Sequence, residues 1–378
     1  MKIYLYTLRY NPASGGGSHH ALATYIRAVA KAGHTPVLTT FFSDDNSYKE
    51  KPCEMREERF HGGFIALQRR VAATMRENQD ADVHVVAGPT LMWGGGMYRK
   101  HGAVPVVVNL NNYTPGMGLQ RNTSLLHRYK WYVWEKLLGV RYARPIDLAI
   151  LESPVVQKEY EHFGYRFKRS VILSSPADIA SSSTLPSPYP NDPALFHVLF
   201  AARLVRDKGP DLFVKAAIGL PQDIHMHVIG SGGEESLLRK LIEENKLATQ
   251  VHLHGWKPRE ELLAFFRHAS LFIHPCRWPE PFGLVVVEAL RAGLPIVATE
   301  DTGAAWAAGE AGVTFKKDDV DELRKHILFF YNNPAACSEY SKKALARAHF
   351  FDADVVASQY VEMLKTLASS TKKNTPFA

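Results

Sequence analysis

The sequence lacks the features that mark secreted, disulfide-bonded or membrane-spanning proteins. It has three cysteines, Cys53, Cys276 and Cys337, and no CxxC pair. Thiols this few and this scattered do not form a disulfide framework or a zinc cluster, so we expect a reducing compartment. No run approaches the roughly 18 apolar residues of a membrane span, and no apolar segment follows Lys2 as it would in a signal peptide. A cytoplasmic protein is therefore expected.

Two common ligand-binding motifs are also missing. The glycine-rich stretch 11–20, NPASGGGSHH, is not the dinucleotide fingerprint GxGxxG, and no acidic residue ends the following strand, TPVLTT. An Asp-x-Asp pair that holds a catalytic metal should follow a strand. Asp80 and Asp82 instead precede one, and Asp352 and Asp354 lie in a late helical segment. We expect neither a metal nor a cofactor.

Composition and charge are those of a globular protein with anionic partners. The 378 residues are 46% hydrophobic and 22% charged, which is ordinary for a globular chain of two domains. The net charge of +7 and the pI near 9.1 favour anionic partners without selecting among them. No nucleic-acid motif accompanies the charge, so nucleic-acid binding is not predicted.

Two series of buried strands alternate with helical segments, separated by the Ser- and Pro-rich stretch 174–194, which we interpret as a linker. The expected strands are 3–8, 35–40, 83–88, 104–110 and 147–153, then 194–202, 223–230, 251–255, 271–275 and 294–300. Near-continuous aliphatic runs are typical of parallel sheets. The prediction is an α/β protein with two doubly wound, Rossmann-like domains facing across a cleft, residues 1–178 and 179–355. A C-terminal helix, 356–378, is expected to pack back toward the first domain.

The most informative segment is EPFGLVVVE, which spaces Glu280 and Glu288 eight residues apart. Pro281 and Gly283 predict a loop that carries Glu280 and a helix that begins near Leu284. The free N–H groups of a helix start suit an anion. Because a carboxylate on each side can accept hydrogen bonds from hydroxyls, the segment predicts a site for a phosphorylated polyol.

Two further loops follow predicted strands. Arg203 and Lys208 are five residues apart in the loop after strand 194–202, where a guanidinium and an ammonium can neutralise a diphosphate. The alternative interpretation is that both residues are solvated surface cations. The glycines at 15–17 allow close approach of a phosphate or a sugar, or else form a plain flexible turn. Loops from both halves of the chain suit a sugar nucleotide in a cleft.

These motifs, taken in order, resemble those of the retaining glycosyltransferases of family 4, which have the two-domain GT-B fold. EPFGLVVVEALRAGLPIVA is similar to the family's Glu-x7-Glu motif. AARLVRDKGPDLFVKA, HVIGSGGEESLLRKLI and VHLHGWKPREELLAFFRHASLFIHPC are similar to its diphosphate, GxG and base-binding segments. The resemblance implies transfer of a hexose-type sugar from a UDP-, GDP- or ADP-sugar to a glycan, lipid-linked or small-molecule hydroxyl acceptor. Such activity is typical of polysaccharide or glycolipid biosynthesis.

The resemblance also implies roles for single residues. Arg203 and Lys208 would bind the donor diphosphate, Glu280 the sugar hydroxyls and Glu288 the ribose. The remaining donor-binding positions are Gly16, Gly17, Gly230, Gly255, Trp256, Lys257, Phe282, Gly283 and Leu284. The family's N-terminal histidine aligns on Ala21 without a gap, or on His20 with a one-residue shift.

One departure from the family concerns Asn111 and Asn112, which stand where the family commonly has a His-Asp pair. Asparagine does not transfer protons near neutral pH, but it can bind a sugar hydroxyl. His20, Asn111 and Asn112 are therefore candidate acceptor or sugar contacts. The alternative function is a catalytically impaired protein that senses a sugar nucleotide. A sugar-nucleotide epimerase of the same fold would not need the Glu280 turn.

Two other features have competing interpretations. Residues 121–144 carry six Arg or Lys among Trp and Tyr residues, which suits either an interfacial helix on the inner face of an anionic membrane or an amphipathic helix packed on the first sheet. Histidines gather on the strands of the second half, and strand alternation predicts that most are structural. They are His225, His227, His252, His254 and His274. Oligomeric state is not indicated by the sequence.

Overall fold

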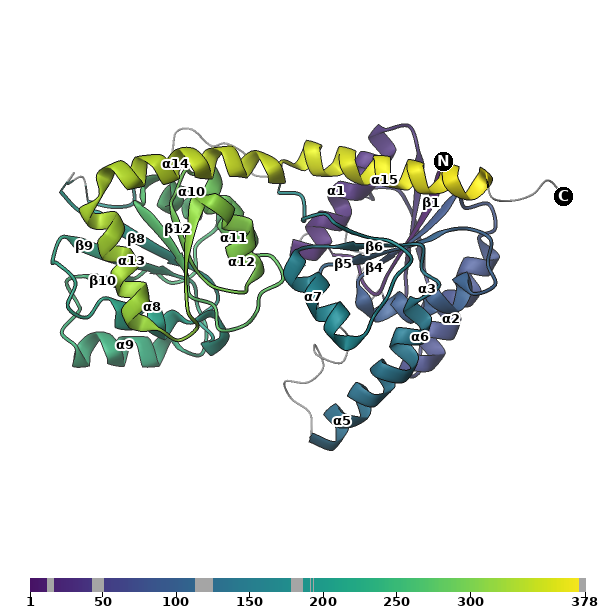
Figure 1. Ribbon diagram of the computed structural model, residues 1–378, viewed down its shortest axis with the longest axis horizontal. Coiled ribbons are helices and arrows are strands. Elements are labelled where there is room, and N and C mark those ends of the chain that lie inside the picture. The colour runs from purple at the N-terminus through teal and green to yellow at the C-terminus, as the bar shows by residue number, and fades with distance from the viewer. Residues whose placement is uncertain are drawn as a thin grey trace. The chain divides into compact units, whose positions relative to one another are not determined.

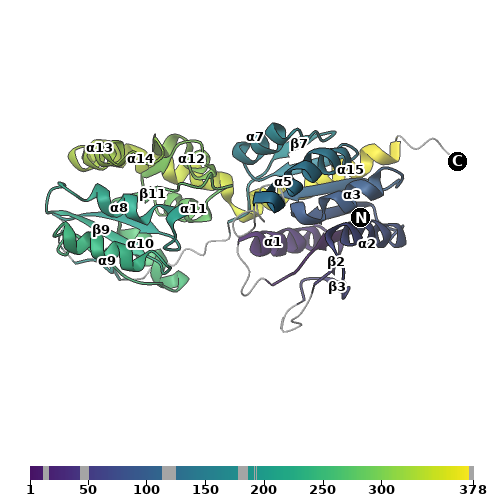
Figure 2. The same ribbon diagram turned by 90° about the horizontal axis from the view of Figure 1, so that it is seen from below.

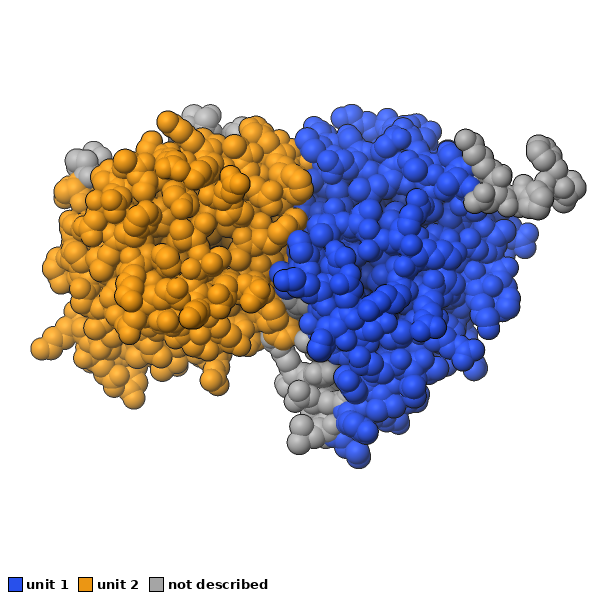
Figure 3. All heavy atoms as spheres, in the orientation of Figure 1, with its two compact units in different colours: residues 1–176, 353–378 blue, residues 177–352 orange. Residues whose placement is uncertain are grey.

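The buried aliphatic runs form two parallel sheets, one in each of two units of the chain. The computed structural model describes residues 1–11, 17–42, 51–112, 125–177, 186–190, 192 and 194–373. The first unit comprises residues 1–176 and 353–378, and the second residues 177–352 (Figure 3). The sequence had suggested boundaries after residues 178 and 355.

The first unit contains a seven-stranded sheet in the order β3-β2-β1-β4-β5-β6-β7, with parallel neighbours throughout. Its strands are β1 (Lys2–Thr7), β2 (Thr35–Thr40), β3 (Glu54–Glu57), β4 (Val83–Ala87), β5 (Val106–Leu110), β6 (Leu148–Leu151) and β7 (Ser170–Ile172). The predictions missed β3 and β7, which lie at the two edges of the sheet (Figure 2). Both are short and at most partly buried, so they lack the aliphatic run that identifies a central strand.

Helices cover both faces of this sheet (Figure 1). The helices α1 (Gly17–Lys31) and α15 (Ala353–Lys373) bury aliphatic residues against one face, where Tyr25 and Tyr360 stack at 4.0 Å. The other helices among the described residues of the unit are α2 (Phe64–Glu77), α3 (Met92–Arg99), α5 (Leu125–Trp134), α6 (Val140–Ala143) and α7 (Pro154–Phe163). A 3₁₀ turn (Pro89–Leu91) precedes α3, and a π-helical turn (Glu135–Gly139) joins α5 to α6.

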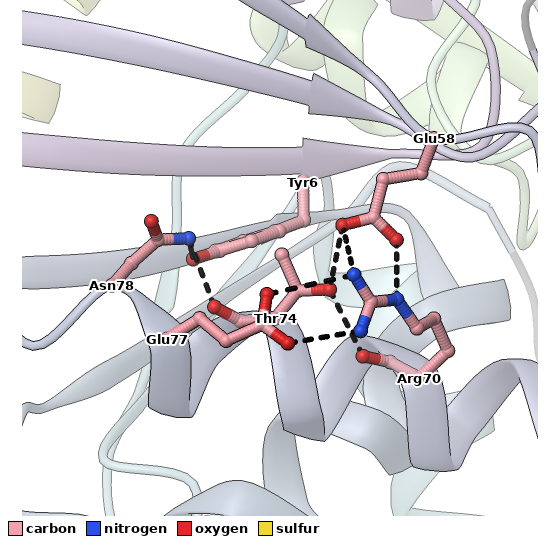
Figure 4. Close-up of polar contacts among 6 residues, drawn as sticks. All are labelled: Tyr6, Glu58, Arg70, Thr74, Glu77 and Asn78. Carbon is pink, nitrogen blue, oxygen red and sulfur yellow. Dashed lines mark hydrogen bonds and ion pairs between the residues drawn. The ribbon is translucent and has the colours of Figure 1, made fainter.

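A polar network fastens the end of β3 to α2 (Figure 4). Arg70 forms a two-pronged ion pair with Glu58, with Nε–Oε2 2.6 Å and Nη2–Oε1 3.0 Å, and Thr74 donates to the same carboxylate at 2.9 Å. Arg70 also reaches Glu77, about two turns further along α2. These contacts compensate for the scarcity of apolar side chains on β3.

The second unit contains a six-stranded parallel sheet in the order β10-β9-β8-β11-β12-β13. Its strands are β8 (Phe196–Ala201), β9 (Ile224–Ile229), β10 (Val251–Leu253), β11 (Leu271–His274), β12 (Ile296–Thr299) and β13 (Gly312–Phe315), and only β13 was not predicted. Successive residues of β8 enter opposite cores: Leu199 packs with α10, α11 and α14, whereas Val198 and Phe200 pack with α8 and α13.

The helices of this unit are α8 (Pro210–Ala216), α9 (Glu235–Glu244), α10 (Arg259–His268), α11 (Leu284–Arg291), α12 (Gly303–Ala308), α13 (Val320–Asn332) and α14 (Pro334–Ala348). Residues 206–208 and 309–311 form 3₁₀ turns, as do residues 349–351. The sequence predicts helices near 209–219, 234–246, 259–268 and 284–292, within a few residues of α8 to α11, because each has an apolar face of helical period.

One face of the second sheet carries a histidine cluster, which we define as His197, His225, His227, His252 and His254. The imidazoles contact one another, with N···N distances of 3.0 Å for His197–His227, 3.0 Å for His227–His254 and 3.1 Å for His225–His252. Tyr189 stacks on His197 at 4.2 Å and is 6% exposed. Part of the expected linker is therefore core, because an aromatic ring covers polar rings that water would otherwise reach.

The described helices include none that is long and apolar enough to cross a membrane. The stretch 174–177, which was also expected in the linker, is buried throughout. Ser174 and Ser175 are buried, and Ala177 forms a parallel bridge with Asp352. Residues 178–185 lie outside the described part of the chain.

Candidate functional site

The candidate site lies at the point where the strand order of the second sheet reverses. Strand β8 is flanked by β9 on one side and β11 on the other, so the loops that leave β8 and β11 diverge to opposite faces of the sheet. In doubly wound sheets, ligands bind at this point, outside the carboxyl ends of the strands. The two loops, 202–209 and 275–283, carry Arg203, Lys208 and Glu280.

Arg277 holds these two loops together. Its guanidinium forms a fork with the Asp211 carboxylate, with Nη1–Oδ1 2.5 Å and Nη2–Oδ2 2.8 Å, and its Nε reaches Asp318 at 2.5 Å. Its backbone N–H donates to the Asp207 carbonyl at 2.8 Å. Burial acts to raise the pKa of Asp211, but Arg277 and Lys215 hold that pKa below its ordinary value. The pair therefore stays charged and fixes the distance between the loops.

A glycine is required where the loops touch. Gly209 has φ +68° and immediately precedes α8, and a side chain on it would overlap the backbone carbonyl of Pro275. Only a residue without Cβ combines this left-handed conformation with such a close approach. The sequence motif "KGPDL" thus encodes the contact that brings Lys208 next to the loop after β11.

Lys208, Glu280 and His274 form a connected triad. The Lys208 ammonium lies 2.5 Å from Oε1 of Glu280, and Nε2 of His274 is hydrogen-bonded to the other oxygen, Oε2. The side chains are 16%, 19% and 1% exposed respectively. Burial acts to raise the pKa of Glu280, yet His274 and Lys208 together bring that pKa well below its ordinary value. A charged carboxylate is therefore available to accept hydrogen bonds.

The same place contains a group of three potential metal ligands, the only one found among the described residues. The ligand atoms of His274, Cys276 and Glu280 lie within 4.8 Å of one another. However, Lys208 already occupies one Glu280 oxygen, and the Cys276 thiol donates to the Asp207 carbonyl at 3.1 Å. Burial raises the pKa of Cys276 to about 11, which keeps its sulfur protonated. Of the other two members, His274 is hydrogen-bonded to Glu280 and Cys276 is bonded to the loop after β8.

The helix α11 begins at Leu284, as the sequence predicts, with Gly283 at φ +91° before it. Phe282 is 3% exposed, and its ring packs against Trp306 and Phe351. Only its backbone groups are therefore available to a ligand. Burial raises the pKa of Glu288, and Arg259, at 3.6 Å, offsets this in part. Glu288 also lines a cavity of about 250 Å³ between α10, α11 and α14.

The remaining donor-binding candidates of this unit lie in loops at the same edge of the sheet. Arg203 is exposed, and within the described residues its guanidinium has no ion pair. Gly230 donates its N–H to the Gly255 carbonyl at 2.9 Å, which joins the loops after β9 and β10. Trp256 is 70% exposed, and Lys257 pairs with Glu261 at 3.1 Å.

The first unit has its own cavity at the corresponding reversal of strand order, between the loops after β1 and β4. It has a volume of about 500 Å³, and its lining includes Arg9, His19, Asn111 and Asn112. His20 is exposed and does not line it. Gly17 is the first residue of α1, whereas Gly16 lies outside the described residues.

Sequence reasoning missed two side chains of these sites. His19 lines the cavity of the first unit, and its Nδ1 accepts the N–H of Asn11 at 3.1 Å. The alignment of loop 11–20 had selected His20, one residue along, which a helix turns by about 100°. His274 was grouped with the structural histidines, because its contact with Glu280 leaves no trace in strand alternation.

Comparison with known proteins is consistent with this arrangement. Residues 187–347 match the family model "Glycosyl transferases group 1". The D-inositol 3-phosphate glycosyltransferase of Pseudarthrobacter chlorophenolicus is 34% identical over 166 residues, which are 42% of this chain and 39% of that protein. The alpha-monoglucosyldiacylglycerol synthase of Acholeplasma laidlawii is 29% identical over 154 residues, 39% of this chain and 38% of that one. The chain thus spans about two fifths of the length of these curated relatives.

The fold is similar over the whole chain to that of solved GT-B proteins. Anabaena HepE, in complex with UDP, has a TM-score of 0.76 at 18% identity, covering 97% of this chain and 100% of that one. The two parallel α/β sheets and this likeness confirm the predicted GT-B fold class. The segment that matches the group 1 glycosyl transferases is the one that carries Arg203, Lys208, Glu280 and Glu288.

Proposed function

We propose that the protein is a retaining glycosyltransferase of family 4 that moves a hexose-type sugar from a nucleotide-diphosphate sugar to a hydroxyl acceptor without a metal. The observation that carries the proposal is the Lys208–Glu280 ion pair at the strand-order reversal of a unit similar to group 1 glycosyl transferases. Support also comes from HepE, whose solved complexes contain UDP and UDP-glucose.

The cations would act on the leaving group. Arg203 and Lys208 would bind the diphosphate, together with the free N–H groups at the start of α11. Negative charge develops on the diphosphate as the bond to the anomeric carbon breaks, so donors already held in place stabilise the transition state. The departing phosphate oxygen would then accept the proton of the acceptor hydroxyl, which makes a protein base unnecessary at Asn111.

The carboxylates would orient the donor. Glu280 is ionised, so it can accept hydrogen bonds from hydroxyls of the transferred sugar. Glu288 would accept those of the ribose, and the backbone at Gly255, Trp256 and Lys257 would contact the base. The acceptor would occupy the cavity of the first unit, where the amides of Asn111 and Asn112 can bind hydroxyl groups. A glycan, a glycolipid or a small molecule would each present such a group.

The test is a thermal-shift screen against UDP-, GDP- and ADP-sugars, followed by proton NMR of the product with a competent acceptor. A ligand that binds only the folded state must raise the melting temperature. Product with the anomeric configuration of the donor supports retention, and inverted product would refute it. Failure of every sugar nucleotide to bind would refute the function itself. Binding with neither transfer nor slow donor hydrolysis would favour the impaired, sensing alternative.

We also propose that α5 contacts an anionic membrane surface peripherally. In Figure 1, α5 extends away from the sheet of the first unit. It exposes Leu126 (79%) and Tyr129 (67%), and Leu137 (66%) follows in the π-helical turn. Lys130 lies among them, while the acidic Glu135 is turned inward and accepts from Tyr165 at 2.8 Å. Apolar and aromatic groups beside cations suit the headgroup region of anionic lipid. Sedimentation with anionic and with neutral vesicles tests this, and binding to neither would refute it.

A further inference from the structure

His274 is an unexpected residue at the end of a buried strand. The residues before it on β11, Phe272 and Ile273, are fully buried and apolar, and His274 itself is 1% exposed. The imidazole leaves its Nδ1 buried without a hydrogen-bond partner among the described residues. Since an unpaired buried polar atom is destabilising, the histidine calls for an explanation other than packing.

The explanation lies at its other nitrogen. Glu280 is a carboxylate and only accepts hydrogen bonds, so the His274 nitrogen that faces it, Nε2, carries the proton. Nδ1 is then the ring nitrogen without a hydrogen-bond partner among the described residues. His274 and Lys208 therefore hold the two oxygens of Glu280 separately, one by a rigid buried ring and the other by a flexible ammonium.

We infer that His274 is the positioning residue of Glu280, which it holds in place when Lys208 turns from the carboxylate to the diphosphate of the donor. This inference rests on the proposed function. A phosphate oxygen competes with Oε1 of Glu280 for the Lys208 ammonium, because both are anionic acceptors within reach of the same flexible side chain. Oε1 is then released to accept a sugar hydroxyl, while Oε2 stays bonded to the ring and the carboxylate keeps its orientation.

The experiment compares His274→Gln, which keeps an N–H donor, with His274→Leu, which removes it. Each is titrated calorimetrically with a nucleoside diphosphate and with its glucose conjugate, using whichever of UDP, GDP or ADP the thermal-shift screen selects. The nucleoside diphosphate has no sugar for Glu280 to bind. We therefore expect its affinity to change less than about twofold in either variant. His274→Leu should weaken the sugar nucleotide about tenfold and lower kcat by roughly 10–100-fold, the usual loss for an orienting contact. His274→Gln should recover most of both.

A double-mutant cycle with Glu280→Gln separates positioning from packing. If His274 acts through Glu280, adding His274→Leu to Glu280→Gln causes no further loss. Phe272→Leu, two residues earlier on the same strand, is the packing control and should lower the melting temperature without changing the ratio of the two affinities.

Four outcomes would overturn the inference. They are wild-type affinity for the sugar nucleotide in His274→Leu, equal weakening of both ligands, additive losses in the double variant, and one zinc ion per wild-type chain that is absent from His274→Leu. A wild-type protein that binds neither ligand would instead refute the proposed function, on which the inference rests.

Discussion

Lowering the pH from 7 to 5 should destabilise the second unit through the histidine cluster. His197 and His227 are 6% and 2% exposed, and among the described residues no carboxylate is hydrogen-bonded to either ring. Burial lowers the pKa of His197 to about 4 and that of His227 to about 2, and the neighbouring imidazoles act in the same direction. Asp192 raises the pKa of His197 only weakly, and Lys257 acts to lower the pKa of His254. Tyr189 and Phe265, which also pack against the cluster, are uncharged rings near neutral pH.

The magnitude follows from the proton uptake of the unfolded chain. An unfolded histidine has a pKa near 6.5, so between pH 6.5 and about 4 the unfolded state binds protons that the folded rings do not. The contribution of the two neutral rings to the free energy of unfolding is therefore fully present above pH 6.5. It falls as the pH drops toward the pKa of the rings in the folded state. At pH 5 the loss is about 2 kcal/mol for each of the two rings, or about 4 kcal/mol together. That is a large part of the roughly 5–15 kcal/mol that holds a domain folded.

The assay is urea unfolding by circular dichroism at pH 7 and pH 5, a window above the ordinary pKa of carboxylates. We expect His227→Gln to reduce the difference in unfolding free energy between the two pH values by about 2 kcal/mol, because one titrating group is gone. His268→Gln, at an exposed position at the end of α10, is the matched control and should keep the full difference. A wild-type loss below about 1 kcal/mol, or an unchanged loss in His227→Gln, would refute the reasoning.

Three further variants probe the site and the surface. Lys208→Ala should lower turnover roughly 10²–10³-fold, because a preorganised charge on the leaving group is lost; steady-state kinetics that matched the wild type would remove Lys208 from the mechanism. Arg277→Ala leaves the buried Asp211 with Lys215 as its remaining ionic partner, so unfolding in urea should be easier by about 1.5–3 kcal/mol; a loss under about 1 kcal/mol would mean that backbone contacts alone join the loops. Leu126→Ser combined with Leu137→Ser should change stability by less than about 0.5 kcal/mol yet abolish sedimentation with anionic vesicles, and persistent sedimentation would place the contact elsewhere.

The sequence predicted those strands whose own residues form a clear apolar run. The central strands β1, β8 and β12 consist mostly of aliphatic and aromatic residues because both of their faces are buried. The edge strand β3, with the sequence EMRE, has no such run and depends on Arg70 and Glu58 for its attachment to α2. It is a strand because its backbone pairs with β2, 17 residues earlier in the chain, and a local pattern does not contain that pairing.

The candidate site, like the fold, could be predicted from the sequence only in part. The turn at Pro281 and Gly283 and the start of α11 at Leu284 are properties of a few adjacent residues, so they could be predicted. That Glu280 is bonded to Lys208, 72 residues earlier, could not be derived from spacing, and the resemblance to family 4 supplied only the roles of both residues. The part of His274 was missed entirely, since a buried strand histidine has the same pattern whether or not it reaches a carboxylate.

The sequence by itself determined which segments are strands and helices in the core and which loops are rich in glycine, proline and charge. It did so because local conformation depends on the period of apolar residues and on backbone freedom within a few positions. Only the tertiary structure decided that β8 and β11 are neighbours, and hence that Lys208, His274 and Glu280 meet. Strand order results from packing over the whole sheet, and the charge state of Glu280 results from partners that this order brings to its two oxygens.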